Sequence, residues 1–264
     1  MEIRPPDGDA SVADLYLDLL EQTLTGAIFE DVGFIPSPTD PNPALAKGYD
    51  AQARHGGIDW PSRAHTMVGL ARLRNLRTLV TRVLGEGIPG DLIETGVWRG
   101  GACIYMRALL AAYGVTDRRV WVADSFAGLP PPNPKEFPAD EGDQLYKIPV
   151  LAVSLDEVRK NFAKYRMLDA QVEFLVGWFK DTLPHAPVET LAILRLDGDM
   201  YESTIQALAS LYDKVSPGGF VIIDDYMIPS CRGAVEDFRG ERRITDGLEV
   251  IDGSAVFWRK RIGT

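Results

Sequence analysis

The chain has 264 residues, 45 % of them hydrophobic and 25 % charged, a composition that can bury a sizeable core. Its formal net charge of −10 argues against nucleic acid or an anionic membrane as the main partner. The first residues lack a signal-peptide pattern, and no apolar run approaches the roughly 20 residues of a membrane span. The two cysteines, Cys103 and Cys231, form no disulfide framework. We therefore expect a cytoplasmic globular protein with free thiols.

The N-terminal third is predicted to be largely helical. Residues 11–28 have apolar side chains at helical spacing, with Ser11 as the expected N-cap. Residues 29–60 are rich in Gly, Pro and Asp, which is typical of an irregular or mobile segment. Helical spacing returns over residues 62–84, and three arginines of this helix, Arg72, Arg74 and Arg77, are expected on a solvated face, where one could contact a subunit. We expect residues 1–88 to form a helical extension.

From residue 89 onward, apolar runs alternate with helical segments. Strands are predicted over residues 91–97, 119–126, 171–177, 191–197 and 219–225. Helices are predicted over residues 101–113, 154–165, 203–212 and 232–239. This alternation predicts a doubly wound, mainly parallel α/β sheet. The last two runs, residues 248–252 and 254–260, predict an antiparallel hairpin, which fits a class I methyltransferase-type Rossmann-like sheet better than the dehydrogenase type.

One segment interrupts the alternation. Residues 127–150 contain six prolines and many charges. The segment is too long for an ordinary connection, so we expect either a lid or disorder. Residues 89–264 are accordingly predicted to form one catalytic domain with a lid-like insertion.

A glycine-rich loop, Glu-Thr-Gly-Val-Trp-Arg-Gly-Gly at residues 94–101, follows a predicted strand and opens a helix. It lacks the G-x-G-x-x-G spacing of dinucleotide-binding loops. Glu94 would repel a pyrophosphate but can pair with an ammonium group, and Asp124 ends the next strand, where a ribose diol is commonly held. This pattern favours S-adenosylmethionine over NAD. The simpler alternative is that Gly96 and Gly100 only make a tight turn between strand and helix.

Three acids follow two buried apolar runs. Asp197 lies in LRLDGDMYEST, and Asp224 and Asp225 lie in GGFVIIDDY. Carboxylates gathered at the carboxyl ends of parallel strands repel one another unless a cation or a shared proton intervenes, so a divalent metal site is expected. Asp199 competes with Asp197 for a chemical role, but Asp199 is expected to cap the helix that begins near Met200.

Long contiguous motifs resemble the TylF/MycF (macrocin O-methyltransferase) family over about residues 11–260. The matching strings are DWPSRAHTMVG, DLIETGVWRGGACIYMRALL, VWVADSFAGLP, VGWFKDTLP, LRLDGDMYEST and SPGGFVIIDDYMIP. The resemblance implies methylation of a deoxysugar hydroxyl on a glycosylated antibiotic, with S-adenosylmethionine and Mg²⁺ as cofactors. It also implies a homo-oligomer, a dimer or larger, with the N-terminal helices as the contact surface. The departures, residues 29–58 and 127–150, are expected to shape the acceptor pocket.

The resemblance also assigns roles to single residues. It implies three metal ligands, Asp197, Asp224 and Asp225, with Asp197 also the general base for a metal-bound sugar diol. It implies that the cofactor is bound by Thr66, Met67, Glu94, Thr95, Gly96, Trp98, Gly100, Gly101, Asp124, Ser125, Phe126, Gly177, Trp178 and Phe179. His65 borders this region and is an alternative base.

Three other functions compete with this interpretation. A metal-dependent glycosyltransferase uses a D-x-D pair, but the acidic glycine loop argues against a nucleotide-sugar diphosphate. A catechol-type methyltransferase shares the acid triad, but it typically has a lysine shortly after the first acid, where this chain reads Gly-Asp-Met-Tyr. A non-catalytic assembly protein is disfavoured because the acid triad is intact.

Overall fold

The structure, a computed structural model, describes residues 11–40, 44–46 and 48–261. Residues 1–10 of the expected N-terminal extension and residues 262–264 of the expected catalytic domain lie outside the described residues. Among the described residues, no helix is long and apolar enough to cross a membrane.

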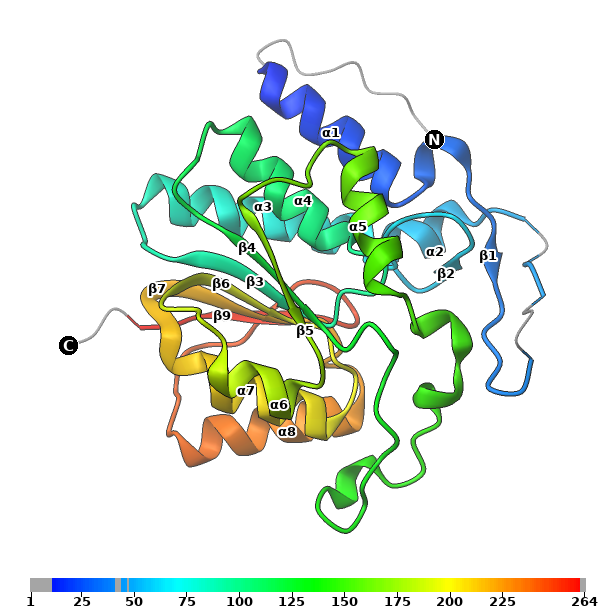
Figure 1. Cartoon of the computed structure of the whole chain (residues 1–264), viewed down its shortest axis with the longest axis vertical. Coiled ribbons are helices and arrows are strands. Elements are labelled where there is room, and N and C mark those ends of the chain that lie inside the picture. Colours follow the sequence, from blue (N-terminus) through cyan, green and yellow to red (C-terminus); the bar gives the residue numbers. More distant parts are fainter. Residues whose placement is uncertain (1–10, 41–43, 47, 262–264) are drawn as a thin grey trace.

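A seven-stranded sheet forms the centre of the fold, in the order β5-β4-β3-β6-β7-β9-β8 (Figure 1). Its first five strands in space are parallel: β5 (Val172–Val176), β4 (Val120–Asp124), β3 (Asp91–Thr95), β6 (Leu191–Leu196) and β7 (Val215–Ile223). The hairpin strands β9 (Val256–Arg259) and β8 (Glu249–Val250) are antiparallel and close one edge. The predicted doubly wound sheet with an antiparallel hairpin is therefore confirmed. The strand order reverses beside β3, where open α/β sheets leave a crevice for ligands.

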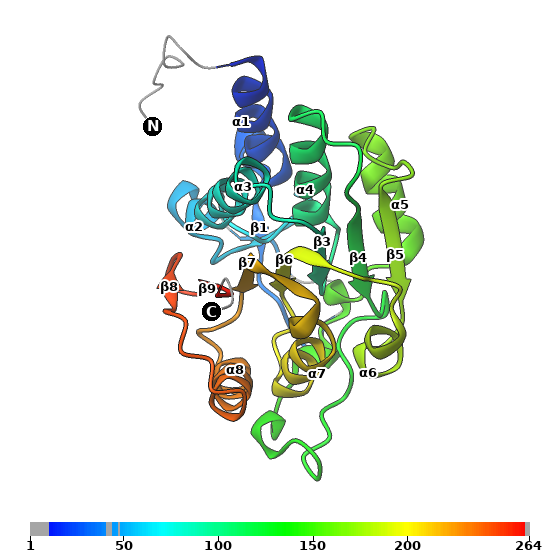
Figure 2. The ribbon, with the colours of Figure 1, turned by 90° about the vertical axis from the view of Figure 1, so that its left-hand side faces the viewer.

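Helices cover both faces of the sheet, as Figure 2 shows. One face is covered by α3 (Leu70–Gly85), α4 (Gly101–Ala112) and α5 (Leu155–Lys164), and α1 (Val12–Leu24) packs on α3 and α4. The other packs against α7 (Tyr201–Leu211) and α8 (Pro229–Glu241), with the short α6 (Phe179–Thr182) beside them. Alternate residues of a strand enter opposite cores: Leu92 packs on the first face and Ile93 on the second. Both layers are apolar, which explains why the parallel strands read as continuous apolar runs.

The N-terminal region departs from the prediction in two places. Residues 29–60 contain ordered elements: α2 (Ala51–Gly56), and β1 (Gly33–Phe34) paired with β2 (Trp60–Pro61). The helix predicted from residue 62 begins only at Leu70. The buried carboxylate of Asp31 is the reason, because it accepts hydrogen bonds from the backbone N–H groups of Arg63 and Ala64 and so holds this stretch outside a helix.

Close contact between two parallel strands explains one glycine of the 94–101 loop. Gly96 follows β3 with a left-handed φ of +86°, and a Cβ atom there would lie 1.8 Å from the carbonyl oxygen of Asp197. The strand ends can therefore approach each other only because residue 96 has no side chain. The tight-turn interpretation thus has a steric basis at this position.

Replacing Gly96 with Ala should strongly destabilise the protein, by at least about 3 kcal/mol, because backbone must move. Gly114→Ala is the matched control: its φ is +68°, but no atom lies within 4 Å of the added Cβ. Conformational strain alone should cost this control about 1 kcal/mol. Urea unfolding measures both variants, and equal losses would show that the contact with Asp197 is not limiting.

Candidate active site

A cavity of about 620 Å³ opens at the carboxyl ends of the parallel strands. Most residues predicted for the site line it: Thr66, Met67, Glu94, Gly96, Trp98, Asp124, Ser125, Trp178, Phe179, Asp197, Asp224 and Asp225. Five predicted cofactor-binding residues do not line it: Thr95, Gly100, Gly101, Phe126 and Gly177. Gly101 instead supports the wall, because a Cβ there would lie 2.4 Å from the carbonyl oxygen of His65.

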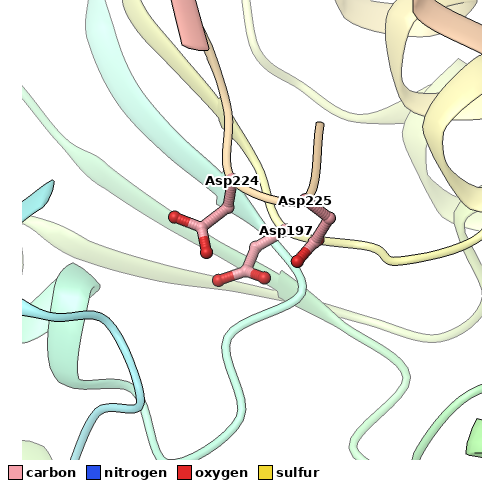
Figure 3. A group of neighbouring side chains, drawn as sticks. All are labelled: Asp197, Asp224 and Asp225. Atoms are coloured by element: carbon pink, nitrogen blue, oxygen red, sulfur yellow. The ribbon is translucent and has the colours of Figure 1, made fainter. Parts of the chain in front are cut away.

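The three acids converge as the strand pattern predicts (Figure 3). β6 and β7 are parallel, and Leu196 is in register with Ile223, so the next residues, Asp197 and Asp224, leave the sheet side by side. One ligand atom from each of Asp197, Asp224 and Asp225 lies within 4.8 Å of the others. Of the three, only Asp224 is buried, whereas Asp197 and Asp225 are partly exposed to the cavity.

Arg195, which the sequence analysis did not single out, lies beneath these acids. Its guanidinium is 2 % exposed and binds carboxylates from three strand ends: Glu94, Asp224, and Asp197 at 2.8 Å. The available signal was an arginine inside the apolar run LAILRLD, because a charge buried in a strand requires buried partners of opposite charge. Glu94, predicted to pair with a ligand ammonium group, lines the cavity and is bound by Arg195 and by the Cys103 thiol.

Arg72 contradicts the expectation of a solvated position. Its side chain is buried, binds Asp224, lies 3.0 Å from Asp252 Oδ2 and donates to the Gly57 carbonyl at 2.7 Å. The prediction for Arg72 was wrong because the groups that contact its side chain come from distant segments: the loop at Gly57, after α2, and the C-terminal hairpin. Two further arginines of α3 pair with acids of α1: Arg74 pairs with Glu21, and Arg77 pairs with Asp14 and Asp18.

The cavity holds more negative than positive charge. Five carboxyl groups (Glu94, Asp197, Asp199, Asp224 and Asp225) line it, and among the described residues only two guanidinium groups bind any of them: Arg195 binds Glu94, Asp197 and Asp224, and Arg72 binds Asp224. Within the described part of the chain, no basic side chain forms an ion pair with Asp225. Burial and the nearby carboxylates raise the pKa of Asp225 well above its usual range and that of Asp199 to about 8. Hard oxygen ligands with uncompensated charge are what a divalent cation such as Mg²⁺ requires, so these residues fit a metal.

The glycine loop is fixed by contacts of its own. Asp124 accepts hydrogen bonds from the backbone N–H groups of Val97 and Phe126, at 2.7 Å each. Trp98 has a left-handed backbone (φ 47°), and its indole N–H donates to the Val150 carbonyl at 2.8 Å. The loop is thus connected to the end of the 127–150 insertion. His65 does not line the cavity: its Nδ1 lies 2.7 Å from the Tyr165 hydroxyl, and burial lowers its pKa to about 4.

The insertion forms one wall of the cavity. Three short 3₁₀ helices shape it, Pro138–Asp140, Leu145–Lys147 and Pro149–Leu151 (green in Figure 1). The buried Asp140 accepts hydrogen bonds from the backbone N–H groups of Tyr201 (2.7 Å) and Glu202 (2.9 Å), at the start of α7. The expectation that Asp199 caps this helix is therefore wrong. The N-cap is Met200, Asp199 has a left-handed φ of 58°, and Asp140 satisfies the free N–H groups from a distant segment.

Comparison with known proteins identifies the family of this chain. The macrocin-O-methyltransferase (TylF) family profile matches residues 13–260. The chain belongs to the macrocin-O-methyltransferase family. A Streptomyces olivaceus relative, 8-demethyl-8-(2,3-dimethoxy-alpha-L-rhamnosyl)-tetracenomycin-C 4'-O-methyltransferase, is 55 % identical over 93 % of this chain and 92 % of its own length. The demethyldecarbamoylnovobiocin O-methyltransferase of Streptomyces niveus is 50 % identical over 95 % of both chains.

A solved structure agrees with this assignment. The O-methyltransferase NovP is 50 % identical to this chain and superposes with a TM-score of 0.87, covering 94 % of this chain and 99 % of its own. Family membership makes this protein an O-methyltransferase. In this member of the macrocin-O-methyltransferase family, the acid cluster and the glycine loop open into one cavity, as a reaction between a methyl donor and an acceptor requires.

Removing Arg72 should destabilise this O-methyltransferase, because Asp224 would keep only one of its two buried cationic partners. We expect Arg72→Met to lower the free energy of unfolding by about 3 kcal/mol. Arg74→Met is the matched control on the same helix, and it should cost about 1 kcal/mol or less because the Arg74 side chain is 57 % exposed. Urea unfolding of both variants measures the difference, and similar losses would contradict a special role for the Arg72–Asp224 pair.

Proposed function

We propose that the protein transfers the methyl group of S-adenosylmethionine to a sugar hydroxyl of a glycosylated natural product, with Mg²⁺ at the acid cluster. The observation that carries the proposal is one cavity that joins the glycine loop to the three acids. The Streptomyces olivaceus relative supports the acceptor class, since its name describes a rhamnosyl tetracenomycin as substrate.

The donor would occupy the side of the cavity formed by β3, β4 and β5. Asp124 lies at the end of β4, where a carboxylate commonly accepts from ribose hydroxyls. Trp98 and Trp178 supply aromatic surface on the same side, and Thr66 and Met67 reach it from the N-terminal region. In this arrangement Arg195 binds both the buried Glu94 and Asp197, and so fixes the position of the donor side of the site relative to the metal side.

The acceptor would lie above β6 and β7. When bound, S-adenosylmethionine supplies an electrophilic methyl group, and Mg²⁺ lowers the pKa of a hydroxyl that it coordinates. The metal would be held by Asp197, Asp224 and Asp225. Asp197 would also accept the proton of the acceptor hydroxyl, while the hydroxyl oxygen forms the new C–O bond with the methyl group and the C–S bond of the donor breaks. Exposure supports Asp197 as the base: its side chain is 27 % exposed, whereas those of Glu94 and Asp224, the other carboxylates on Arg195, are 2 % and 5 % exposed.

Replacing Asp197 with Asn should abolish turnover, by at least about 100-fold in kcat, because the amide cannot accept the proton. Binding of S-adenosylhomocysteine, measured by calorimetry, should stay close to that of the wild type. Asp199→Asn is the comparison variant, since Asp199 also lines the cavity. Loss of activity in Asp199→Asn together with retained activity in Asp197→Asn would assign the base to Asp199 instead.

Removal of divalent metal should stop turnover without releasing the methyl donor. We expect activity to disappear in EDTA and to return with Mg²⁺, and Mg²⁺ alone should raise the melting temperature of the wild-type protein. Asp225→Asn should lose this Mg²⁺-dependent rise, whereas Asp213→Asn, which alters an exposed acid paired with Arg242, should retain it. Full activity in EDTA would contradict the metal assignment.

A further inference from the structure

Two exposed apolar side chains line the cavity. Within the described part of the chain, several large apolar residues are highly exposed, and two of them, Ile58 (72 % exposed) and Met227 (56 % exposed), belong to the cavity wall. Neither is used by the methyl transfer outlined above. An apolar side chain left exposed inside a binding cavity marks a surface that a ligand can cover.

The backbone around Ile58 is held rigidly although its side chain is exposed. The Ile58 N–H donates to the Ala53 carbonyl at 3.1 Å, and the preceding Gly57 carbonyl accepts from Arg72. The following residue, Asp59, pairs at 2.6 Å with the buried Arg54. Ile58 is therefore presented to the cavity by a fixed loop, and little conformational entropy is lost when a ligand covers it.

Met227 is held by comparable backbone contacts. Its N–H donates to the Ser254 carbonyl at 3.0 Å, and the Ser254 N–H in turn donates to Asp252. Arg72 contacts Asp252 and the Gly57 carbonyl, so one guanidinium connects the segment that bears Ile58 with the turn that holds Met227. Methionine is unbranched and polarizable, which suits contact with apolar groups of varied shape.

The strand order places Met227 on the side away from the donor, and Arg72 joins the Ile58 segment to that side by binding both Asp224 and the Gly57 carbonyl. Asp124 ends β4, Asp197 follows β6, and Met227 comes two residues after Asp225 beyond the end of β7; in the sheet, β3 and β6 lie between β4 and β7. In a displacement at the donor methyl group, the acceptor oxygen approaches opposite to the leaving sulfur. The remainder of the acceptor therefore extends past the acids, toward Ile58 and Met227.

We propose that Ile58 and Met227 form a binding subsite for the apolar aglycone of the glycoside acceptor. This inference rests on the proposed function, in which the sugar lies at the acid cluster. It assigns the recognition of the non-sugar part to the Gly57 loop and the segment after β7. An aromatic or otherwise apolar aglycone would cover both side chains, and a small alkyl group would leave them exposed to water.

Two acceptors that share a sugar test the subsite, phenyl α-L-rhamnoside and methyl α-L-rhamnoside. Burial of the phenyl ring should raise kcat/KM of the wild type for the phenyl glycoside roughly tenfold over the methyl glycoside. The double variant Ile58→Thr, Met227→Gln replaces both apolar surfaces with polar ones of similar size. Its ratio of the two kcat/KM values should fall toward one.

Val250→Thr is the matched control, because Val250 is 75 % exposed but does not line the cavity. Its ratio should equal that of the wild type, and melting temperatures establish that all variants are folded. A wild-type ratio near one, or an unchanged ratio in the double variant, would overturn the subsite and leave the proposed function standing. Absence of methyl transfer to both glycosides, with transfer to a free catechol, would instead overturn the proposed function and the subsite with it.

Discussion

The buried guanidinium of Arg195 is the interaction on which the site depends. It binds acids from the ends of three adjacent strands, Glu94, Asp197 and Asp224, and is itself 2 % exposed. Removing these charges from water costs several kcal/mol per ion unless partners compensate for it. The arrangement is stable only when the three strand ends are in register. Arg195 therefore sets the relative position of the glycine loop and the acid cluster.

Arg72 extends the same network outward. It binds the Asp224 carboxylate oxygen that Arg195 does not bind, and it connects Asp224 with the Gly57 loop and with Asp252 of the C-terminal hairpin region. Two cavity walls that are distant in sequence thus meet at one buried acid. Asp140 performs a comparable task for the insertion, because its carboxylate binds free N–H groups at the start of α7. The cavity is shaped by long-range polar contacts placed on an apolar sheet.

The local hydrophobic pattern was sufficient to predict the strands and helices whose formation depends mainly on burial of their own apolar side chains. Most strands and longer helices between residues 91 and 260 were predicted close to their observed bounds, because strands covered on both faces read as apolar runs; the short α6 was missed, and β7 begins at Val215, four residues before its predicted start. The convergence of Asp197, Asp224 and Asp225 followed from the same argument, since parallel strands end at one edge. Prediction failed where a distant residue changes local preference. Residues 62–69 follow a helical spacing, yet the Asp31 carboxylate binds the backbone N–H groups of Arg63 and Ala64, and no helix forms there.

The sequence by itself determined the class of fold, the family, and the edge of the sheet where the acids meet. The reason is that hydrophobic periodicity and strand direction are properties of short segments. Only the tertiary structure decided which arginines bind Asp197 and Asp224, which residue caps α7, and which apolar side chains face the cavity. The helical spacing does not show which side of the helix Arg72 faces relative to the rest of the chain, because its partners, Asp224 and Asp252, are distant in sequence. Charge pairing over such separations depends on packing, which no local pattern contains.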